Sequence, residues 1–472
     1  MKIGLGVDVA CRAAHQVSCA DEHGVMLWVG HRFRTDPDEL EALWRKLPPD
    51  AAEVMVVMEP TRNAWVALAA WFRRHGATVV MIPPEQSADL RAYYAKHAKT
   101  DRLDSKTLAR LPLLHPEGLH REDTLGPGEM LKRAVKVRSG LVHRRTTSMA
   151  RLDALLEILG PAWVAAIGSD MSLTALRFLA RYGDPRTVKR LGPARLAEFF
   201  RRSSRGAWHH ERADAVIEAA ETTLRLWGAD GLDFDALAAD IAVEARLALA
   251  VSEEIKELDK RITHAYERVD PDGIVRSAPG VGRIGAPQIA GRLGEATRFA
   301  NLPAVRSFAG LVPRQDSSGI AARAGGPTKA GDACLREALF IAADHARKID
   351  PTLAARYHRL ITEGGKHHNS AVCTVAAVLL TRIAACLRAG RPYQLRDTDG
   401  TLITEQRGRQ IVTDRYTIPA AVRASRRHLT STTRTSRRNE RAQKGVARRS
   451  EAPPVPEPAC TWAGSPSTLD GD

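Results

Sequence analysis

The first nine residues place the strongest constraint on the fold, because apolar side chains alternate there with very small or acidic ones. The run reads Ile3, Gly4, Leu5, Gly6, Val7, Asp8 and Val9. This period of two predicts a β-strand with one apolar face, and it directs Asp8 to the opposite face. The chain is therefore expected to begin with a strand that buries one side and carries a carboxylate on the other.

The following segments predict an α/β domain with a mixed sheet. Two further strands, over 15–20 and 25–33, are joined by a turn and give the sheet an antiparallel start. Thr35 is expected to cap a helix that has Pro37 in its first turn. Later elements are expected as a strand at 54–58, a helix at 63–75, a strand at 78–82, a helix at 86–94 and a helix from Asp101. Three antiparallel strands followed by alternating helices and strands make a mixed sheet with helices on its faces.

The remainder is predicted to be mainly helical. Gly and Pro nearly vanish over 128–159 and 234–269, which predicts two long helices. The second contains a short heptad seam made of Val251, Ile255, Leu258 and Ile262. That seam fits a buried helix stripe and an intermolecular coiled coil equally well. We expect four parts: an α/β domain at 1–127, a long-helix or coiled-coil region at 128–270, a mainly α C-terminal domain at 271–395, and a basic disordered tail at 396–472.

The charge of the chain favours a polyanionic partner. There are 70 Lys and Arg residues against 55 Asp and Glu, for a net charge of +15, and the excess is not confined to the Arg-rich tail. Such a balance favours DNA, RNA or both as partners. The six cysteines form no Cys-x-x-Cys pair and no regular framework, which argues against zinc and disulfide architectures. Because apolar runs are too short to span a membrane, we expect a cytoplasmic protein with reduced thiols.

Four carboxylates occupy positions that a fold can bring together. Asp8 lies on the first strand, Glu59 ends the strand at 54–58, and Asp101 and Asp104 share one face of a first helical turn. Acids also favour first turns through the helix dipole, so the last pair alone fits a structural role. As a set, however, they can hold Mg²⁺, and two such ions stabilise the attacking and leaving oxygens of a phosphodiester.

A glycine-rich segment over 279–285 contains the pattern G-x-G-x-x-G. The Pro and polar residues before it argue against the strand that a dinucleotide site requires. The segment fits a plain turn as well as a hairpin that binds phosphate through the amides of Gly280 and Gly282 and the charge of Arg283. We keep both interpretations.

A Ser-Gly element follows at Ser318, beside Ser317, and such a pair usually marks a turn. Lys329 and Arg336 come after it, in a Gly-rich loop and the start of a helix. These two cations can neutralise a phosphate, although solvated positions at a helix start explain them equally.

Three motifs of the first part carry a family resemblance. They are Gly6-Val7-Asp8-Val9, Met58-Glu59-Pro60-Thr61 and Lys99-Thr100-Asp101-Arg102-Leu103-Asp104-Ser105. They resemble the ribonuclease H-like, RuvC-like DEDD domain of insertion-sequence transposases of the IS110 and IS1111 type. The block over 277–393 resembles the C-terminal transposase domain of the same family through its Pro-Gly-x-Gly, Gly-Leu-x-Pro and Ser-Gly elements. Asp332 is a departure, since it stands where the family commonly has Asn.

The resemblance implies a transposase that cleaves and exchanges DNA strands. By this resemblance, the four acids bind Mg²⁺, in a site for two ions, and Ser318 attacks DNA to form a phosphoserine link, with Ser317 as the alternative nucleophile. It further implies a homo-oligomer, dimer or tetramer, in which the acidic site of one subunit meets the serine site of another. The implied partners are the DNA of the element ends and target and an element-encoded noncoding guide RNA, in the bacterial cytoplasm at the nucleoid.

Other functions use parts of the same pattern. A RuvC-type Holliday junction nuclease would use the acids with metal-activated water and would not need Ser318. An actin-like sugar kinase or ATPase also opens with an Asp-bearing strand, but it needs further glycine turns for phosphate that we do not find. A non-catalytic nucleic-acid-binding protein would bind independently of metal and form no covalent adduct.

Overall fold

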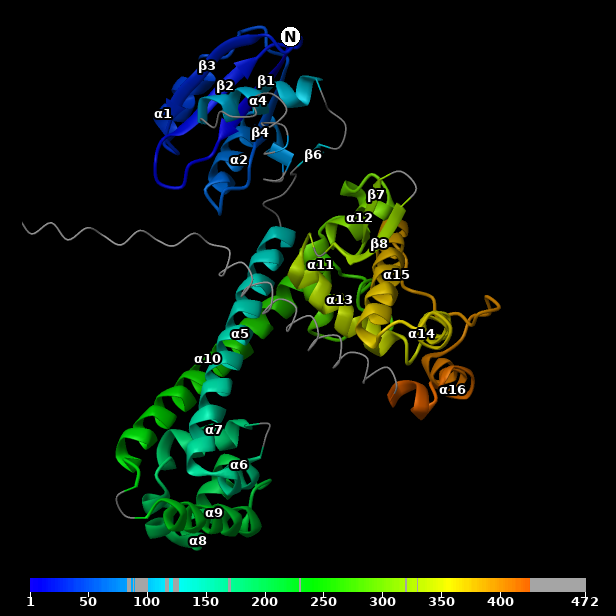
Figure 1. Cartoon of the computed structure of the whole chain (residues 1–472). Coiled ribbons are helices and arrows are strands. Elements are labelled where there is room, and N and C mark those ends of the chain that lie inside the picture. The colour runs from blue at the N-terminus through cyan, green and yellow to red at the C-terminus, as the bar shows by residue number, and fades with distance from the viewer. Residues whose placement is uncertain are drawn as a thin grey trace, which may run out of the picture. The chain divides into compact units, whose positions relative to one another are not determined.

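The computed structural model describes residues 1–82, 86–87, 89, 101–114, 119–121, 127–168, 171–228, 231–318, 321–328 and 330–424 (Figure 1). The chain divides into two compact units. The first comprises Met1–Ala346 and Ala376–Leu395, and the second comprises Arg347–Val375 and Arg396–Asp472. The N-terminal sheet, the long helices and the hairpin described below all belong to the first unit.

A mixed sheet forms the N-terminal domain, with strand order β3-β2-β1-β4-β5-β6. Its strands are β1 (Lys2–Asp8), β2 (His15–Ala20), β3 (Met26–Phe33), β4 (Glu53–Met58), β5 (Thr78–Met81) and the two-residue β6 (His120–Arg121). β1 pairs antiparallel with β2 and parallel with β4. The predicted mixed sheet is confirmed, and the order of its first five strands is consistent with a ribonuclease H-like fold.

Helices cover both faces of this sheet (Figure 1). On one face, α1 (Pro37–Trp44) and α2 (Trp65–Arg74) share a core with Ile3 and Leu5, both fully buried. On the other face, α4 (Asp101–Leu114) contacts β1, β2, β3 and β4. The apolar face of β1 thus contributes to the core under α1 and α2, while the face that carries Gly4 and Gly6 lies against α4.

Glycine occurs in β1 where α4 crosses it. A Cβ atom at Gly4 would lie 2.1 Å from the carbonyl oxygen of Ala109. One at Gly6 would lie 2.1 Å from both Ser105 O and Ala109 N. Beside this crossing, the hydroxyls of Ser18 and Ser105 form a buried hydrogen bond of 2.8 Å. The absence of side chains at these two glycines lets the helix backbone approach the strand backbone directly.

The cap of α1 differs from the prediction. Asp36, rather than Thr35, accepts hydrogen bonds from the backbone N–H groups of Asp38 at 3.0 Å and Glu39 at 3.2 Å. Thr35 Oγ1 instead hydrogen-bonds His15 Nε2 at 2.8 Å. Both residue types cap helices well, and the helix starts at Pro37, directly after Asp36.

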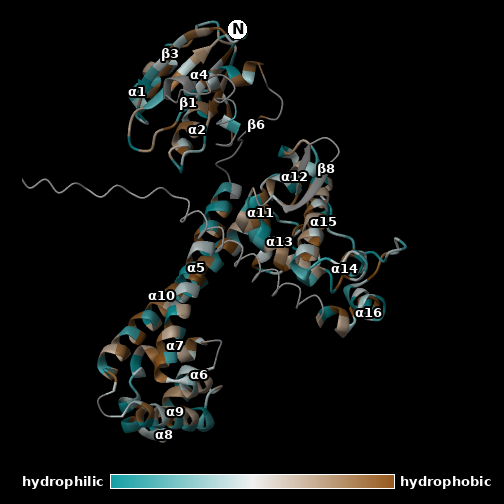
Figure 2. Ribbon diagram, in the orientation of Figure 1, coloured by the Kyte–Doolittle hydropathy of each residue, from teal (hydrophilic) through white to brown (hydrophobic). Residues whose placement is uncertain are grey.

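The two predicted long helices are α5 (Pro127–Leu159) and α10 (Phe234–Val269). They pack along each other within the chain, and Figure 2 shows hydrophobic and hydrophilic residues mixed along both. Ile255, Leu258 and Ile262 of the heptad seam are buried in this arrangement. Packing within one chain therefore favours the buried-stripe interpretation of the seam.

Four further helices lie between the two long ones in sequence and were not predicted. They are α6 (Pro161–Ile167), α7 (Leu173–Tyr182), α8 (Pro185–Ser203) and α9 (His210–Trp227). Together with parts of α5 and α10 they enclose an apolar core of their own, in which Trp163 and Phe178 are fully buried.

The C-terminal part is mainly helical, as expected. Its elements are α11 (Gly285–Leu293), η1 (Ala296–Arg298), α12 (Leu302–Phe308), β7 (Pro313–Ser318), β8 (Ala321–Pro327), α13 (Ala333–Ala346), α14 (Pro351–Thr362), α15 (His368–Ala389) and α16 (Glu405–Tyr416). By length and composition α15 could cross a membrane, contrary to our expectation, yet half of its apolar window is buried inside the protein, as in a core helix.

The prediction of a disordered tail from residue 396 is wrong for its first part. α16 packs against α14, and the buried carboxylate of Asp397 accepts hydrogen bonds from Thr398 N at 2.7 Å and Arg415 Nη1 at 3.2 Å. A few buried side chains, including Ile411, are enough to fold this polar segment onto its neighbour. Residues 425–472, with most of the Arg-rich run, lie outside the described residues.

The close crossing of α4 over β1 predicts a clear effect of Gly6→Ala. Since the added methyl group would meet backbone atoms that cannot rotate away, we expect a loss of roughly 1–3 kcal/mol or more in stability of the domain. Gly140→Ala is the control, because a Cβ there has nothing within 4 Å and Gly140 lies inside α5. Thermal unfolding followed by circular dichroism should show a lower first transition for Gly6→Ala only; equal behaviour would contradict this account.

Candidate active site

Asp8 and Glu59 lie at the same end of two adjacent strands. β1 and β4 are parallel, and their register pairs Val7 with Met58. Asp8 follows Val7, and Glu59 follows Met58. The two carboxylates therefore lie at the C-terminal ends of two neighbouring parallel strands. Both residues are half-buried, at the rim of the core rather than inside it.

The first turn of α4 reaches the same end of the sheet. Gly4 lies against Ala109, and Gly6 lies against Ser105 and Ala109, so the helix runs opposite to β1. Two strand residues span about 6.6 Å and four helix residues span about 6 Å, so each step of two residues along β1 corresponds to about four residues along α4. One further step places Asp8 beside the start of α4, where Asp101 and Asp104 occur.

The donor set at this edge suits a hard divalent cation, because Asp8, Glu59 and Asp104 offer carboxylate oxygens. Asp104 is half-buried, whereas the side chain of Asp101 lies outside the described residues. Among the side chains that are described, no three acids, histidines or cysteines come close enough to hold an ion together. The backbone thus gathers the predicted acids at one edge without a finished ion site among the described groups.

Both predicted serines belong to a β-hairpin rather than to an open loop. Ser317 pairs with Ala322 and Ser318 pairs with Ala321, so the serines end β7 just before a two-residue connection. The side chains of both serines, and residues 319 and 320, lie outside the described residues. The backbone therefore sets Ser318 at the tip of the hairpin.

The base of this hairpin is held by close backbone packing. A Cβ at Gly310 would lie 2.5 Å from Ala330 O, and one at Gly331 would lie 2.4 Å from Phe308 O. Both glycines have positive φ values, of 65° and 137°. Only glycine fits this crossing, which fixes where β7 leaves and where β8 returns.

Asp332 continues the same junction. Its carboxylate caps α13 by accepting a hydrogen bond from Leu335 N at 2.8 Å, and it accepts another from Arg292 Nε of α11 at 2.7 Å. The side chains are 7% and 17% exposed, so the ion pair is largely removed from water. Arg292 was missed in the sequence because its partner lies 40 residues away, and no local pattern marks it.

The predicted phosphate-binding residues fall into four situations. Gly280 has φ 76°, and a Cβ there would lie 2.3 Å from Ala342 O, so α13 already requires a glycine at this position. Gly282 and Arg283 are exposed. Arg336 is half-buried and donates through Nη1 to Ala309 O at 3.1 Å. Lys329 lies outside the described residues.

Asp332→Asn separates the two roles of this carboxylate. Asn caps a helix as well as Asp does, but it leaves the guanidinium of Arg292 buried without a counter-charge, at a cost of about 3 kcal/mol. Native-state hydrogen exchange should therefore show faster opening of the amides of α13 in Asp332→Asn, and a larger effect in Asp332→Ala. Unchanged protection in Asp332→Asn would show that the ion pair contributes nothing.

Comparison with known proteins agrees with this geometry. Residues 5–161 match a transposase family of the IS110 DEDD type, and residues 272–358 match the transposase IS116/IS110/IS902 family. An insertion element IS110 uncharacterized 43.6 kDa protein from Streptomyces coelicolor is 26% identical over 398 residues, which cover 83% of this chain and 95% of the relative.

A second relative supports the same assignment. It is an insertion element IS900 uncharacterized 42 kDa protein from Mycobacterium paratuberculosis, 27% identical over 353 residues, with 73% of this chain and 85% of the relative covered. The first match contains Asp8, Glu59, Asp101 and Asp104, and a DEDD domain implies the use of divalent metal. The second match contains Ser318. This chain belongs to the IS110 family of transposases, enzymes that transfer phosphodiester bonds in DNA.

Proposed function

We propose that this transposase cleaves and exchanges DNA strands with Mg²⁺ held by Asp8, Glu59, Asp101 and Asp104, and with Ser318 as the nucleophile. The observation that carries the acidic half of this proposal is the parallel register of β1 and β4, with α4 crossing β1 at two glycines. When bound, the ion would neutralise charge on the phosphate that is being cleaved.

The proposed roles of the chain's own residues follow from their positions. The acids at the sheet edge supply oxygen ligands on rigid elements, which is what orientation of a phosphodiester requires. The hydroxyl oxygen of Ser318 attacks phosphorus and forms a new P–O bond, while the bond to the leaving sugar oxygen breaks. The serine hydroxyl loses its proton to the surrounding water as the P–O bond forms, and the released sugar oxygen takes up one proton from water, so no net proton is gained or lost.

Exchange rather than hydrolysis then follows from the second step. A sugar hydroxyl of another strand attacks the phosphoserine, restores the serine hydroxyl and seals the new junction. No water is consumed in either step, so the bond energy is kept in the serine ester. This is the physical advantage of a covalent link over a metal-activated water.

The wider assembly is part of the same proposal. We place the enzyme in the bacterial cytoplasm, at the nucleoid, as a homo-oligomer in which one subunit's acids meet another subunit's serine. A noncoding RNA from the element would select the DNA sites by base pairing, while the protein binds the backbone. The positive charge of the chain supports partners of this kind.

Removal of one acid should strongly slow strand cleavage. We expect Glu59→Gln to lower the cleavage rate of an element-end duplex at least about a hundredfold, because one charge-stabilising group is lost. Glu53→Gln is the matched control, since Glu53 is the exposed residue at the opposite end of the same strand. Cleavage that survives Glu59→Gln, or that fails equally in both variants, would contradict the assigned role.

The serine proposal predicts a covalent product. Incubation of the protein and RNA transcribed from the flanking DNA with a labelled element-end duplex and Mg²⁺ should give a protease-sensitive adduct on a denaturing gel. The adduct should disappear in Ser318→Ala and persist in Ser317→Ala, its neighbour on the same strand. Cleavage without any adduct would instead support a junction nuclease that uses water.

A further inference from the structure

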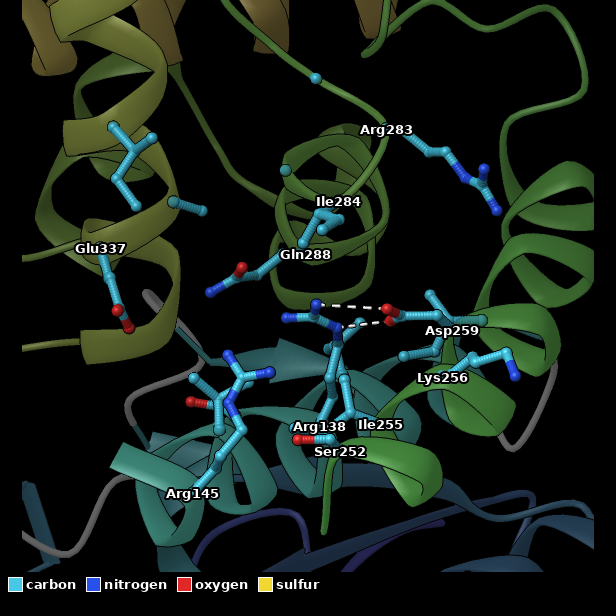
Figure 3. Close-up of a pocket in the computed structure, with 18 of the residues that line it drawn as sticks. Arg138, Arg145, Ser252, Ile255, Lys256, Asp259, Arg283, Ile284, Gln288 and Glu337 are labelled. Atoms are coloured by element: carbon cyan, nitrogen blue, oxygen red, sulfur yellow. Dashed lines mark hydrogen bonds and ion pairs between the residues drawn. The ribbon is translucent and has the colours of Figure 1, made fainter. Parts of the chain in front are cut away.

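A groove lies between the two long helices and the C-terminal helices of the first unit. It encloses about 1420 Å³ and is lined by α5, α10, α13 and the turn 280–285 that leads into α11, with smaller contributions from α7. We call it the basic groove. Figure 3 shows Arg145 and Glu337 toward one side, Lys256 and Arg283 toward the other, and Arg138 between them.

The lining of the basic groove is strongly charged, with a positive excess. Its acids are Glu253, Asp259 and Glu337, and its lysines and arginines are Arg138, Arg145, Arg177, Lys256, Lys260 and Arg283. Two of the acids are already neutralised: Asp259 pairs with Arg138, at 2.5 Å from Nε, and Glu253 with Lys256, at 2.9 Å from Nζ. The cations are thus twice as numerous as the acids, which favours an anionic occupant.

Two of the arginines in the basic groove are available to an incoming ligand. Arg145 Nε is buried, and no atom among the described residues accepts its hydrogen bond. A buried charged donor left in this state is costly unless a ligand or water accepts from it. Arg283 is exposed, and within the described part of the chain it forms no ion pair. Both side chains can therefore bind phosphate without giving up an interaction inside the protein.

The glycines of the basic groove point to close approach of a ligand. Gly280 is required by α13, as described above, but a Cβ at Gly282 or Gly285 would have nothing within 4 Å. Neither of these two has a positive φ. Moreover, no side chain caps α11. In its first turn Ala286 N donates to Gly282 O at 3.0 Å and Pro287 has no N–H, so half-buried Gly285 is the residue there that can offer its amide to a ligand. Packing does not explain glycine at these positions, whereas an oxyanion in contact with the backbone does.

We propose that the basic groove binds the sugar-phosphate backbone of a nucleic acid, either the DNA that this transposase cleaves or the RNA that guides it. The proposal rests on the proposed function and deepens it, because it assigns backbone binding to Arg145 of α5, which no motif marks, together with the turn at 280–285. Arg145 and Arg283 each donate to a phosphate oxygen, and the path over Gly282 and Gly285 brings the backbone against the amide of Gly285 at the start of α11. Glu337 opposes this binding.

The test measures binding without catalysis. Fluorescence anisotropy in EDTA, with a 30-base-pair DNA duplex in one arm and a structured RNA in the other, reports affinity independently of the acids and of Ser318. Arg145→Gln and Arg283→Gln should each weaken binding about tenfold in at least one arm, the scale of a hydrogen bond to a charged group. The slope of log affinity against log salt should fall by about 0.9 per lost contact for duplex DNA, or 0.7 for single-stranded segments.

Matched variants make the test specific. Arg144→Gln and Arg246→Gln remove the same charge from exposed positions of α5 and α10 outside the basic groove, and should change affinity less than about twofold. Gly285→Ala favours the helix and meets no atom of the chain, so it should weaken binding without loss of thermal stability. Glu337→Gln should strengthen binding, because it removes a negative charge that faces the ligand.

The outcomes separate cleanly. Weakened binding in the DNA arm, the RNA arm or both, with unchanged controls, supports the basic groove and identifies which nucleic acid it holds. Equal effects of groove and control variants would overturn it, since only general charge would then matter. Loss of cleavage in Glu59→Gln with normal anisotropy leaves the basic groove intact, so failure of the active-site proposal is recognised separately.

Discussion

The contact on which the N-terminal domain depends is the direct approach of α4 to β1. Gly4 and Gly6 offer no side chains, so backbone atoms of Ser105 and Ala109 occupy the space that a Cβ would need. The same approach brings the Ser18 and Ser105 hydroxyls together. Because the helix is held in step with the strand, its acidic first turn arrives beside Asp8. The positions of Asp8 and of the first turn of α4 are thus set by the packing of α4 along β1.

A second junction organises the C-terminal part of the first unit. α13 is capped by Asp332, which also binds Arg292 of α11, and one turn later it presents Glu337 to the basic groove. Its last turn packs against Gly280. The hairpin that carries Ser318 leaves from the same junction. One helix, α13, therefore connects the hairpin that carries the proposed nucleophile with the basic groove. A substitution at Asp332 is expected to alter the structure of both.

Sequence patterns predicted what is local. Three kinds of local pattern predicted elements: the alternation from Ile3 to Val9, the apolar run before Glu59, and the Gly-poor runs at 128–159 and 234–269. The structure contains all of these elements, as β1, β4, α5 and α10. Register then brings Asp8 and Glu59 together without further information. The candidate site residues could be predicted from local patterns because each lies at the end or the start of a strand or helix.

What could not be predicted depends on contacts between distant residues. The core around α6–α9 joins residues as far apart in sequence as Leu152 and Ala248, and no heptad or alternation predicts it. Arg138 and Asp259 meet across 121 residues, so the basic groove exists only after α5 and α10 have paired. The order of residues 396–424 was missed because its burial comes from α14 rather than from its own composition.

Mass spectrometry of the reaction products tests the central claim most directly, namely that the acids and Ser318 act on the same phosphate. After digestion with nuclease and trypsin, the peptide from Gln315 to Arg323 should carry a nucleotide remnant on Ser318 when Mg²⁺ is present. The remnant should be absent from the Glu59→Gln enzyme. A remnant on Ser317, or cleaved DNA with an unmodified peptide, would contradict the mechanism.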